Sequence, residues 1–135
     1  MWTHEESIEI EAPAARVWQL FRDVAGWKRW NAGIEHIELH GPFATGTTFT
    51  MQPPGEDAFV STLIAVSENA GFTDETVIDG TRVVVEHRIE PTSAGGARVT
   101  YATQIHGPGA EDFGPLVTGD FGDVLKGLKR MAEAG

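Results

Sequence analysis

The sequence contains no cysteine, which excludes disulfide bridges, thiolate zinc sites, redox dithiols and cysteine nucleophiles. No apolar run approaches the roughly 18 residues that a membrane-spanning helix needs, so no membrane insertion is predicted. The first residues, Met-Trp-Thr-His-Glu-Glu, lack the basic start and the apolar stretch of a secretory signal peptide. Together these absences predict a cytoplasmic protein.

Basic side chains are scarce. The chain has ten Lys and Arg residues against twenty Asp and Glu residues, which gives a formal net charge of −10. Between Arg29 and Arg82 there is no Lys or Arg, whereas eight acidic residues fall in that stretch. Such a charge repels phosphate backbones and anionic lipids, so neither nucleic acid nor a membrane surface is a predicted partner. The acidic residues either solubilise one side of the domain or attract a cationic partner.

Cofactor motifs are missing as well. The sequence has no GxGxxG, P-loop, serine elbow or EF-hand, so no nucleotide, calcium or other cofactor is predicted. His36, Glu38 and His40 alternate along one predicted strand, a pattern that could indicate a metal site. They share the solvent face if Ile37 and Leu39 are buried, and we therefore predict no metal site.

The 135 residues, 41% of them hydrophobic, are typical of one soluble globular domain, and without a linker a single domain is predicted over residues 1–135. Residues 7–11 alternate as in a strand, and apolar residues at helical spacing follow Pro13 before a short aromatic segment at 27–30. Apolar steps of three and four predict a helix over about 115–133, entered through a turn at 108–114. Period-two patterns predict six further strands, at 34–39, 46–52, 58–67, 71–78, 81–90 and 97–106. The order β-α-α-β6-α with hairpin turns indicates an α+β fold in which a long C-terminal helix covers an antiparallel sheet.

The turn at residues 79–80, Asp-Gly, sets the predicted strand register. It places Phe72 opposite His87, and the next hairpin places His87 opposite Tyr101. Asp74 then becomes the diagonal neighbour of His87, at roughly 7–8 Å between backbones. The inner sheet face thus holds a small polar group within apolar surroundings: Asp74, His87, Tyr101 and Thr103.

The C-terminal helix adds one polar residue and an unusual number of glycines. Asp120 falls inside the apolar arc, near its edge. Four glycines interrupt the segment, each costing about 1 kcal/mol relative to alanine in a helix interior. We expect them to serve close backbone approach or a helix that must move, the alternative being neutral or capping positions: Gly114, Gly119, Gly122 and Gly127.

A curved sheet closed by one helix can enclose an apolar cavity with a few polar groups. The alternative is that the same residues fill the core, with His87 hydrogen-bonded to Tyr101 or Asp74. The inward face of strand 58–67 stays open, because Val60, Ile64 and Val66 compete with Phe59 and Leu63. The candidate ligand-binding residues are Trp30, Phe49, Met51, Phe59, Leu63, Phe72, Val85, His87, Tyr101, Thr103, Leu116, Val117, Asp120 and Phe121.

A series of short segments occurs in order along the chain, from about residue 5 to 133. In these segments the chain resembles the polyketide cyclase/dehydrase-like family of the START and birch-pollen-allergen-like (SRPBCC) superfamily, whose fold is the helix-grip. The resemblance implies a curved seven-stranded antiparallel sheet around a long C-terminal helix, two short helices after the first strand, and a hydrophobic cavity. The segments are residues 7–13 with Val17 and Trp18, the tryptophan pair within 23–31, Gly46, Phe72 with Asp74 and Glu75, residues 86–91, residues 95–100 and residues 113–116.

The superfamily includes lipid and quinone carriers, hormone receptors, aromatic polyketide cyclases and co-chaperones, so the fold does not select one function. The first hypothesis is a monomeric or homodimeric carrier that binds a small hydrophobic, aromatic or polycyclic molecule. The second is a cyclase or dehydratase with His87 as general base, Asp74 orienting it, Tyr101 as donor or acid, and Asp120 as a further proton-transfer group. The third is a protein-interaction module, which predicts a cavity too small for a ligand.

Overall fold

The structure is a computed structural model that describes residues 1–134. Seven strands form one antiparallel sheet in the order β1-β7-β6-β5-β4-β3-β2, and the predicted architecture is confirmed. Each predicted strand is present, although β1 begins at Trp2, five residues before the predicted start. The strands are β1 (Trp2–Ile10), β2 (His36–Leu39), β3 (Thr48–Gln52), β4 (Phe59–Ser67), β5 (Gly71–Ile78), β6 (Thr81–Pro91) and β7 (Ala97–His106).

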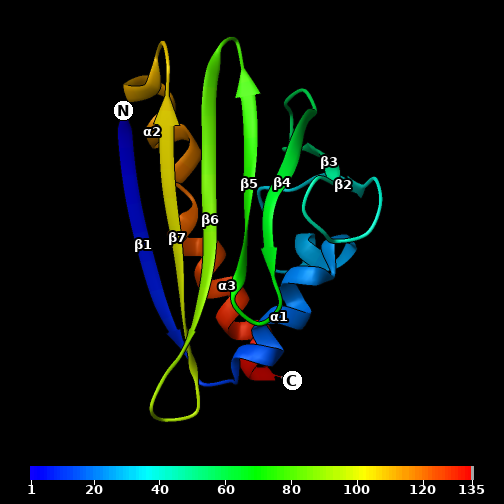
Figure 1. The fold of residues 1–135 in the computed structure, drawn as a ribbon, viewed down its shortest axis with the longest axis vertical. Coiled ribbons are helices and arrows are strands. Elements are labelled where there is room, and N and C mark those ends of the chain that lie inside the picture. Colours follow the sequence, from blue (N-terminus) through cyan, green and yellow to red (C-terminus); the bar gives the residue numbers. More distant parts are fainter. Residues whose placement is uncertain (135) are drawn as a thin grey trace.

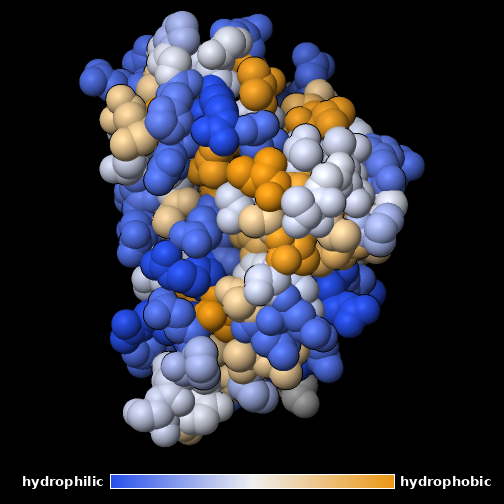
Figure 2. Space-filling view, in the orientation of Figure 1, coloured by the Kyte–Doolittle hydropathy of each residue, from blue (hydrophilic) through white to orange (hydrophobic). Residues whose placement is uncertain are grey.

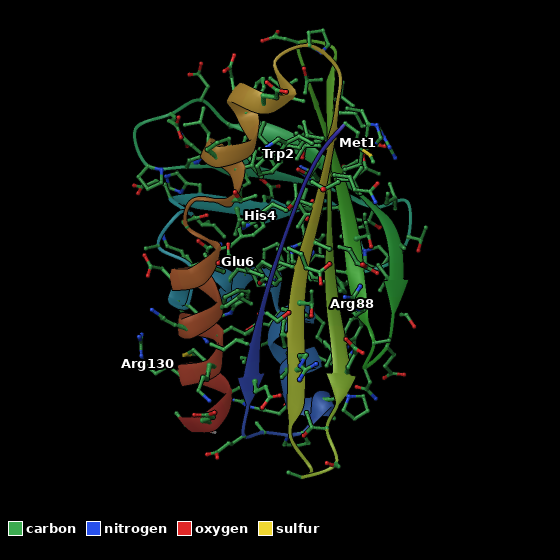
Figure 3. All side chains as sticks on the ribbon, turned by 90° about the vertical axis from the view of Figure 1, so that its left-hand side faces the viewer. Met1, Trp2, His4, Glu6, Arg88 and Arg130 are labelled. Atoms are coloured by element: carbon green, nitrogen blue, oxygen red, sulfur yellow. The ribbon has the colours of Figure 1, made fainter. Side chains whose placement is uncertain are left out.

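The helices lie at the ends of the sequence and on one side of the sheet. After β1 come α1 (Ala14–Arg22) and the 3₁₀ helix η1 (Val24–Arg29), and after β7 come α2 (Ala110–Thr118) and α3 (Phe121–Ala134). Both α2 and α3 run along the same face of the sheet, behind it in the view of Figure 1 and beside it in Figure 3. No helix in the described part of the chain is long and apolar enough to cross a membrane.

The C-terminal helical segment differs in its bounds from the predicted helix at 115–133. It starts at Ala110, so Pro115 lies inside α2, and it is interrupted at Gly119 and Asp120. The Thr118 hydroxyl donates a 3.0 Å hydrogen bond to the Gly114 carbonyl, a bond that bends helices. The Asp120 carbonyl then accepts the Val124 N–H at 2.9 Å and begins α3.

The predicted register of the central strands is confirmed. Phe72 pairs with His87 and Asp74 with Val85 across β5 and β6, and His87 pairs with Tyr101 across β6 and β7. Asp79 and Gly80 both have positive φ, at 51° and 80°, as a two-residue type I′ hairpin requires. The inner face of three adjacent strands is therefore the face that the sequence predicts.

A register shift between Leu63 and Ala65 settles which side of β4 faces inward. Before this bulge Ser61 and Leu63 are buried, while Val60 and Ile64 are exposed; beyond it Val66 packs against the core. The competing patterns in the sequence were both partly correct, because a bulge reverses the alternation. Figure 2 shows the outer sheet face, where patches of apolar surface lie amid hydrophilic surface. Val60 and Val77 are 55% and 61% exposed.

Three of the four C-terminal glycines allow a close approach. At Gly119 this approach is within the helix break itself, where a Cβ would lie 2.8 Å from the Pro115 carbonyl oxygen, and at the other two it is to another element. A Cβ at Gly114 would collide with the Trp2 indole, and a Cβ at Gly127 would collide with the Trp30 main-chain carbonyl. At Gly122 the nearest atom would be a Glu6 carboxylate oxygen at an ordinary 3.6 Å. Close approach to another element therefore accounts for Gly114 and Gly127.

Candidate functional site

A cavity of about 810 Å³ lies between the inner sheet face and the α2–α3 segment. Strands β3 to β7, η1 with the residues after it, the β3–β4 loop and both C-terminal helices contribute to its walls. Leu116, which is 81% exposed, and Asp120 at the helix break also border it, so the cavity opens beside the α2–α3 segment. The domain is therefore hollow where the sequence leaves a choice between a hollow and a filled core.

All but two of the residues predicted to bind a ligand line this cavity. The exceptions are Leu63 and Thr103, which are 0% and 1% exposed and lie in the packed core. Alternation along a strand predicts the face of a side chain but not whether empty space borders it, which explains both misplacements.

Other lining residues were missed by the sequence reasoning. Three of them, Trp27, Phe113 and Val124, belong to helical segments, where the spacing of apolar residues predicts a buried face but not which of its residues border a cavity. Several others belong to the β3–β4 loop, which has no periodicity to follow. Ser61 and Thr76 hydrogen-bond to each other at 2.6 Å in the wall. The remaining missed residues are Asn31, Gly33, Ile34, Pro53, Pro54, Glu56, Asp57, Ala58, Ile78 and Val83.

His87 is held by its neighbours in β5 and β7. Its ring stacks on Phe72 at a centroid distance of 4.1 Å and meets Tyr101 edge-on at 4.5 Å. Its Nδ1–H donates to the Phe72 carbonyl at 3.2 Å, so this main-chain oxygen, rather than Asp74 or the Tyr101 hydroxyl, orients the ring. Burial lowers the pKa of His87 to about 3. The imidazole is neutral at pH 7, and its Nε2 remains an acceptor.

The pKa of Asp74 shifts in the opposite direction to that of His87. It projects from β5 into the cavity wall, and no hydrogen-bond or ion-pair partner for its side chain occurs among residues 1–134. Burial raises the pKa of its carboxyl to about 7, because a low-dielectric environment disfavours the charged form. The residue as a whole is half-buried, and it lines the cavity. Near neutral pH it can both bind and release a proton.

Tyr101 and Asp120 are the other two candidate catalytic residues. Tyr101 is 4% exposed and meets Phe121 edge-on at 5.4 Å. Burial, and then the charges of Asp74 and Asp120, raise the pKa of its phenol, so it stays protonated. Asp120 is exposed at the cavity opening, where partial burial and then the neighbouring Asp123 and Glu6 raise the pKa of its carboxyl. The structure thus brings Asp74, His87 and Tyr101 together and places Asp120 at the opening.

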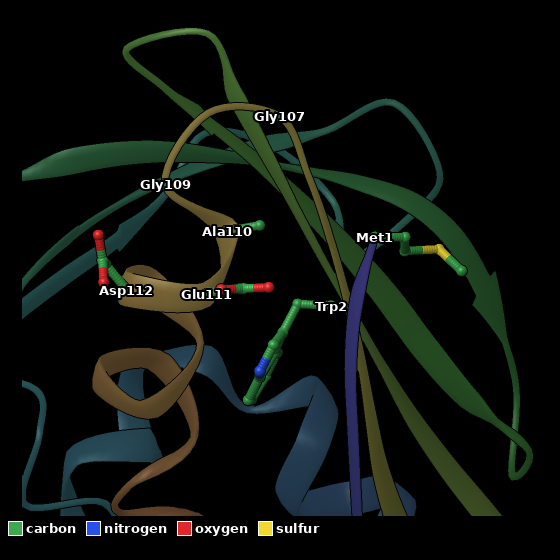
Figure 4. Close-up of a pocket in the computed structure, with 7 residues that line it drawn as sticks. All are labelled: Met1, Trp2, Gly107, Gly109, Ala110, Glu111 and Asp112. Atoms are coloured by element: carbon green, nitrogen blue, oxygen red, sulfur yellow. The ribbon is translucent and has the colours of Figure 1, made fainter.

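A second hollow of about 450 Å³ lies at the start of β1 and α2 (Figure 4). Its walls are mainly polar and contain none of the predicted site residues. They are formed by Met1, Trp2, Gly107, Gly109, Ala110, Glu111 and Asp112. The four candidate catalytic residues, Asp74, His87, Tyr101 and Asp120, all line the larger cavity instead.

Comparisons with solved structures identify the same fold in proteins of low sequence identity. Ara h 8.0201 superposes with a TM-score of 0.78 at 16% identity, covering 99% of each chain. Protein MLL2253 from Mesorhizobium loti superposes with a TM-score of 0.78 at 15% identity, covering 96% of this chain and 95% of that one. Norcoclaurine synthase from Thalictrum flavum superposes with a TM-score of 0.77 at 17% identity, covering 96% of this chain and 85% of that one.

No match is found among curated proteins. The sequence does match a protein family over residues 1–133, which is nearly its whole length. The family is described by two activities, ring closure or dehydration of polyketides and the transport of lipids. Because this match covers nearly the whole sequence, the chain belongs to the polyketide cyclase / dehydrase and lipid transport family.

Proposed function

We propose that this protein binds a small hydrophobic molecule with an aromatic or polycyclic ring system in the cavity between the sheet and the α2–α3 segment. The observation that carries the proposal is the cavity itself, whose volume of about 810 Å³ falls within the range of roughly 300–1,000 Å³ of small-molecule sites. Ring edges and faces from several elements border it, which favours an aromatic guest. The family description, with its cyclase and lipid-transport members, supports the same class of ligand.

Native mass spectrometry of freshly purified protein tests the proposal directly, because a co-purified apolar molecule should appear as a defined added mass. A calorimetric titration with 2-(naphthalen-2-yl)ethanol, a neutral aromatic probe, should show saturable binding. Calorimetry then compares two equal substitutions. Val85→Trp fills the cavity and should abolish binding, whereas Val77→Trp adds the same ring to the outer face, where Val77 is 61% exposed.

Binding that survives Val85→Trp unchanged would contradict the proposal, since the probe would then occupy another site. So would the absence of both a co-purified molecule and probe binding. A protein-interaction module, the third hypothesis from the sequence, predicts a cavity without room for a ligand, and the volume found does not favour it.

A proton-transfer enzyme is a second candidate, favoured by the Asp74 carboxyl. General bases work best when their pKa lies near the working pH, and the pKa of Asp74 is about 7 whereas that of His87 is about 3. The sequence-based hypothesis gave the base role to His87, with Asp74 in support; the pKa values favour Asp74 as the base. The Tyr101 phenol would donate to the enolate oxygen that forms when a proton α to a carbonyl is removed.

Deuterium exchange into 2-tetralone, an aromatic ketone with acidic α protons, measures this proton transfer. The protein should accelerate exchange, Asp74→Asn should remove the acceleration, and His87→Gln should reduce it far less. A larger loss in His87→Gln than in Asp74→Asn would return the base role to His87, and an equal loss would contradict the assignment of the base to Asp74 alone. Absence of acceleration by the unaltered protein would leave binding as the whole function.

A further inference from the structure

We propose that the natural ligand of the cavity is a protonated aromatic amine, whose ammonium group pairs with the Asp74 carboxylate while its ring system fills the apolar space. This inference rests on the proposed binding function and names the chemical class of its ligand. It follows from the charges of the cavity wall, from the unpaired state of Asp74 and from the aromatic composition of the wall.

The charged groups of the wall are all of one sign. No Lys or Arg lines the cavity anywhere in the described chain, so an anionic ligand such as a fatty acid carboxylate or a phosphate has no counter-charge there. The wall among the described residues does include a histidine, His87, but burial keeps its imidazole neutral. Four acidic residues contribute to the wall, namely Glu56, Asp57, Asp74 and Asp120.

Position separates Asp74 from the other three carboxylates. Glu56 and Asp57, in the β3–β4 loop, and Asp120, at the helix break, are exposed at the opening. There they raise the local concentration of a cation. Asp74 lies deeper, on the central strand β5, and its side chain has no partner among residues 1–134. A buried carboxylate without a partner is costly, and a ligand ammonium would remove that cost with a charge-assisted hydrogen bond.

The remaining walls suit a cation that carries a ring. Cations are attracted to the faces of tryptophan, tyrosine and phenylalanine, and aromatic side chains enclose the cavity from sheet and helices alike. The group that meets the ammonium is therefore acidic, and the surface that meets the rest of the ligand is aromatic. The aromatic side chains that line the cavity are Trp27, Trp30, Phe49, Phe59, Phe72, Tyr101, Phe113 and Phe121.

Asp74 is also the group whose charge can change near neutral pH. The titratable side chains around it come from every neighbouring element: His87 on β6 is neutral, Tyr101 on β7 is protonated, and the three exposed carboxylates border the opening. No cation among the described lining residues competes for Asp74. Amine binding should therefore strengthen as the pH rises through the pKa of Asp74, with the binding of a neutral ligand unaffected or slightly weakened.

Three probes with the same ring distinguish the alternatives: 2-(naphthalen-2-yl)ethylamine, the neutral 2-(naphthalen-2-yl)ethanol and the anionic 3-(naphthalen-2-yl)propanoate. At about pH 8 the unaltered protein should bind the amine at least tenfold more tightly than the alcohol, the fold-change expected of a hydrogen bond to a charged group. The carboxylate should bind most weakly. Between about pH 6 and pH 8 the affinity for the amine should rise several-fold.

Two variants locate the effect. Asp74→Asn should reduce the amine's advantage over the alcohol to less than about threefold. The matched control Glu68→Gln removes the same charge from an exposed turn between β4 and β5, outside the cavity wall, and should keep the full preference.

The outcomes separate this inference from the function on which it rests. If the alcohol binds as tightly as the amine to the unaltered protein, the inference is wrong and the binding function stands. The same holds if the carboxylate is preferred, or if Asp74→Asn keeps the preference for the amine. If none of the three probes binds, both the proposed function and this inference fail.

Discussion

Replacing Asp74 with Asn should make the folded protein more stable above neutral pH, because it removes a carboxylate that burial disfavours. Asn has the shape of the protonated Asp74 side chain and carries no charge at any pH. The pKa of the carboxyl is about 7 in the folded protein and about 4 in an unfolded chain. The folded state therefore binds more protons between these values, and the free energy of unfolding falls as the pH rises from about 4 through about 7.

The size of this effect follows from the pKa difference. Each pKa unit corresponds to about 1.4 kcal/mol, so a rise of about three units sets a ceiling near 4 kcal/mol above pH 7. Water that enters the open cavity screens the charge, and we expect about 2 kcal/mol. Asp74→Asn should therefore raise the free energy of unfolding by about 2 kcal/mol at pH 8.5 and by clearly less at pH 5.5.

Urea denaturation followed by tryptophan fluorescence measures both free energies, with Glu68→Gln as the control for the loss of one acidic charge. The control should change the free energy of unfolding by less than about 0.5 kcal/mol at either pH. A gain from Asp74→Asn that is the same at both pH values would refute the titration argument. A loss of stability at high pH would show that the carboxylate has a favourable partner in the folded state.

Two further substitutions test the packing around the cavity. Gly127→Ala should lower the free energy of unfolding by about 1–2 kcal/mol, because the added Cβ meets the rigid Trp30 carbonyl. Gly122→Ala in the same helix should leave the free energy of unfolding unchanged or raise it by up to about 1 kcal/mol. Equal effects of the two substitutions in urea denaturation would contradict the assigned role of Gly127. Phe72→Ala should lower the free energy of unfolding by about 3 kcal/mol in the same assay. The reason is that the Phe72 ring packs against four other rings, those of Phe21, Trp27, Phe43 and His87. A decrease below about 1 kcal/mol would mean that this cluster does not close the cavity wall.

The sheet could be predicted from the sequence because its information is local. Alternation marks each strand face, and the Asp79-Gly80 turn fixes the pairing of β5 with β6, so His87 was correctly placed opposite Phe72 and Tyr101. The start of β1 was missed for a related reason. Its inner face carries His4 and Glu6, which hydrogen-bond to each other at 2.9 Å beneath α3 (Figure 3), and two polar inner residues hide the alternation.

Tertiary features of the helices and of the cavity were not predictable in this way. The helix is interrupted after Thr118, whose hydroxyl bonds to the Gly114 carbonyl, and no spacing of apolar residues reveals such a bond. Leu63 and Thr103 were placed on the correct face but on the wrong side of the boundary between core and cavity. Depth within a layer depends on how the opposing helices curve, and a single sequence does not encode that in its periodicity.

The contrast between Asp74 and His87 explains why this cavity should respond to the charge of a ligand. The two residues are diagonal neighbours on the inner face, and an acid beside a base could have formed an ion pair. Burial instead drives both toward neutrality, lowering the pKa of His87 and raising that of Asp74. As a result, the Asp74 carboxyl is partly protonated and partly ionised near pH 7. A ligand ammonium would shift this balance by drawing out the Asp74 proton, so binding would be coupled to proton release. A neutral aromatic molecule offers no such exchange, and the difference between the two is the physical basis for selection by this site.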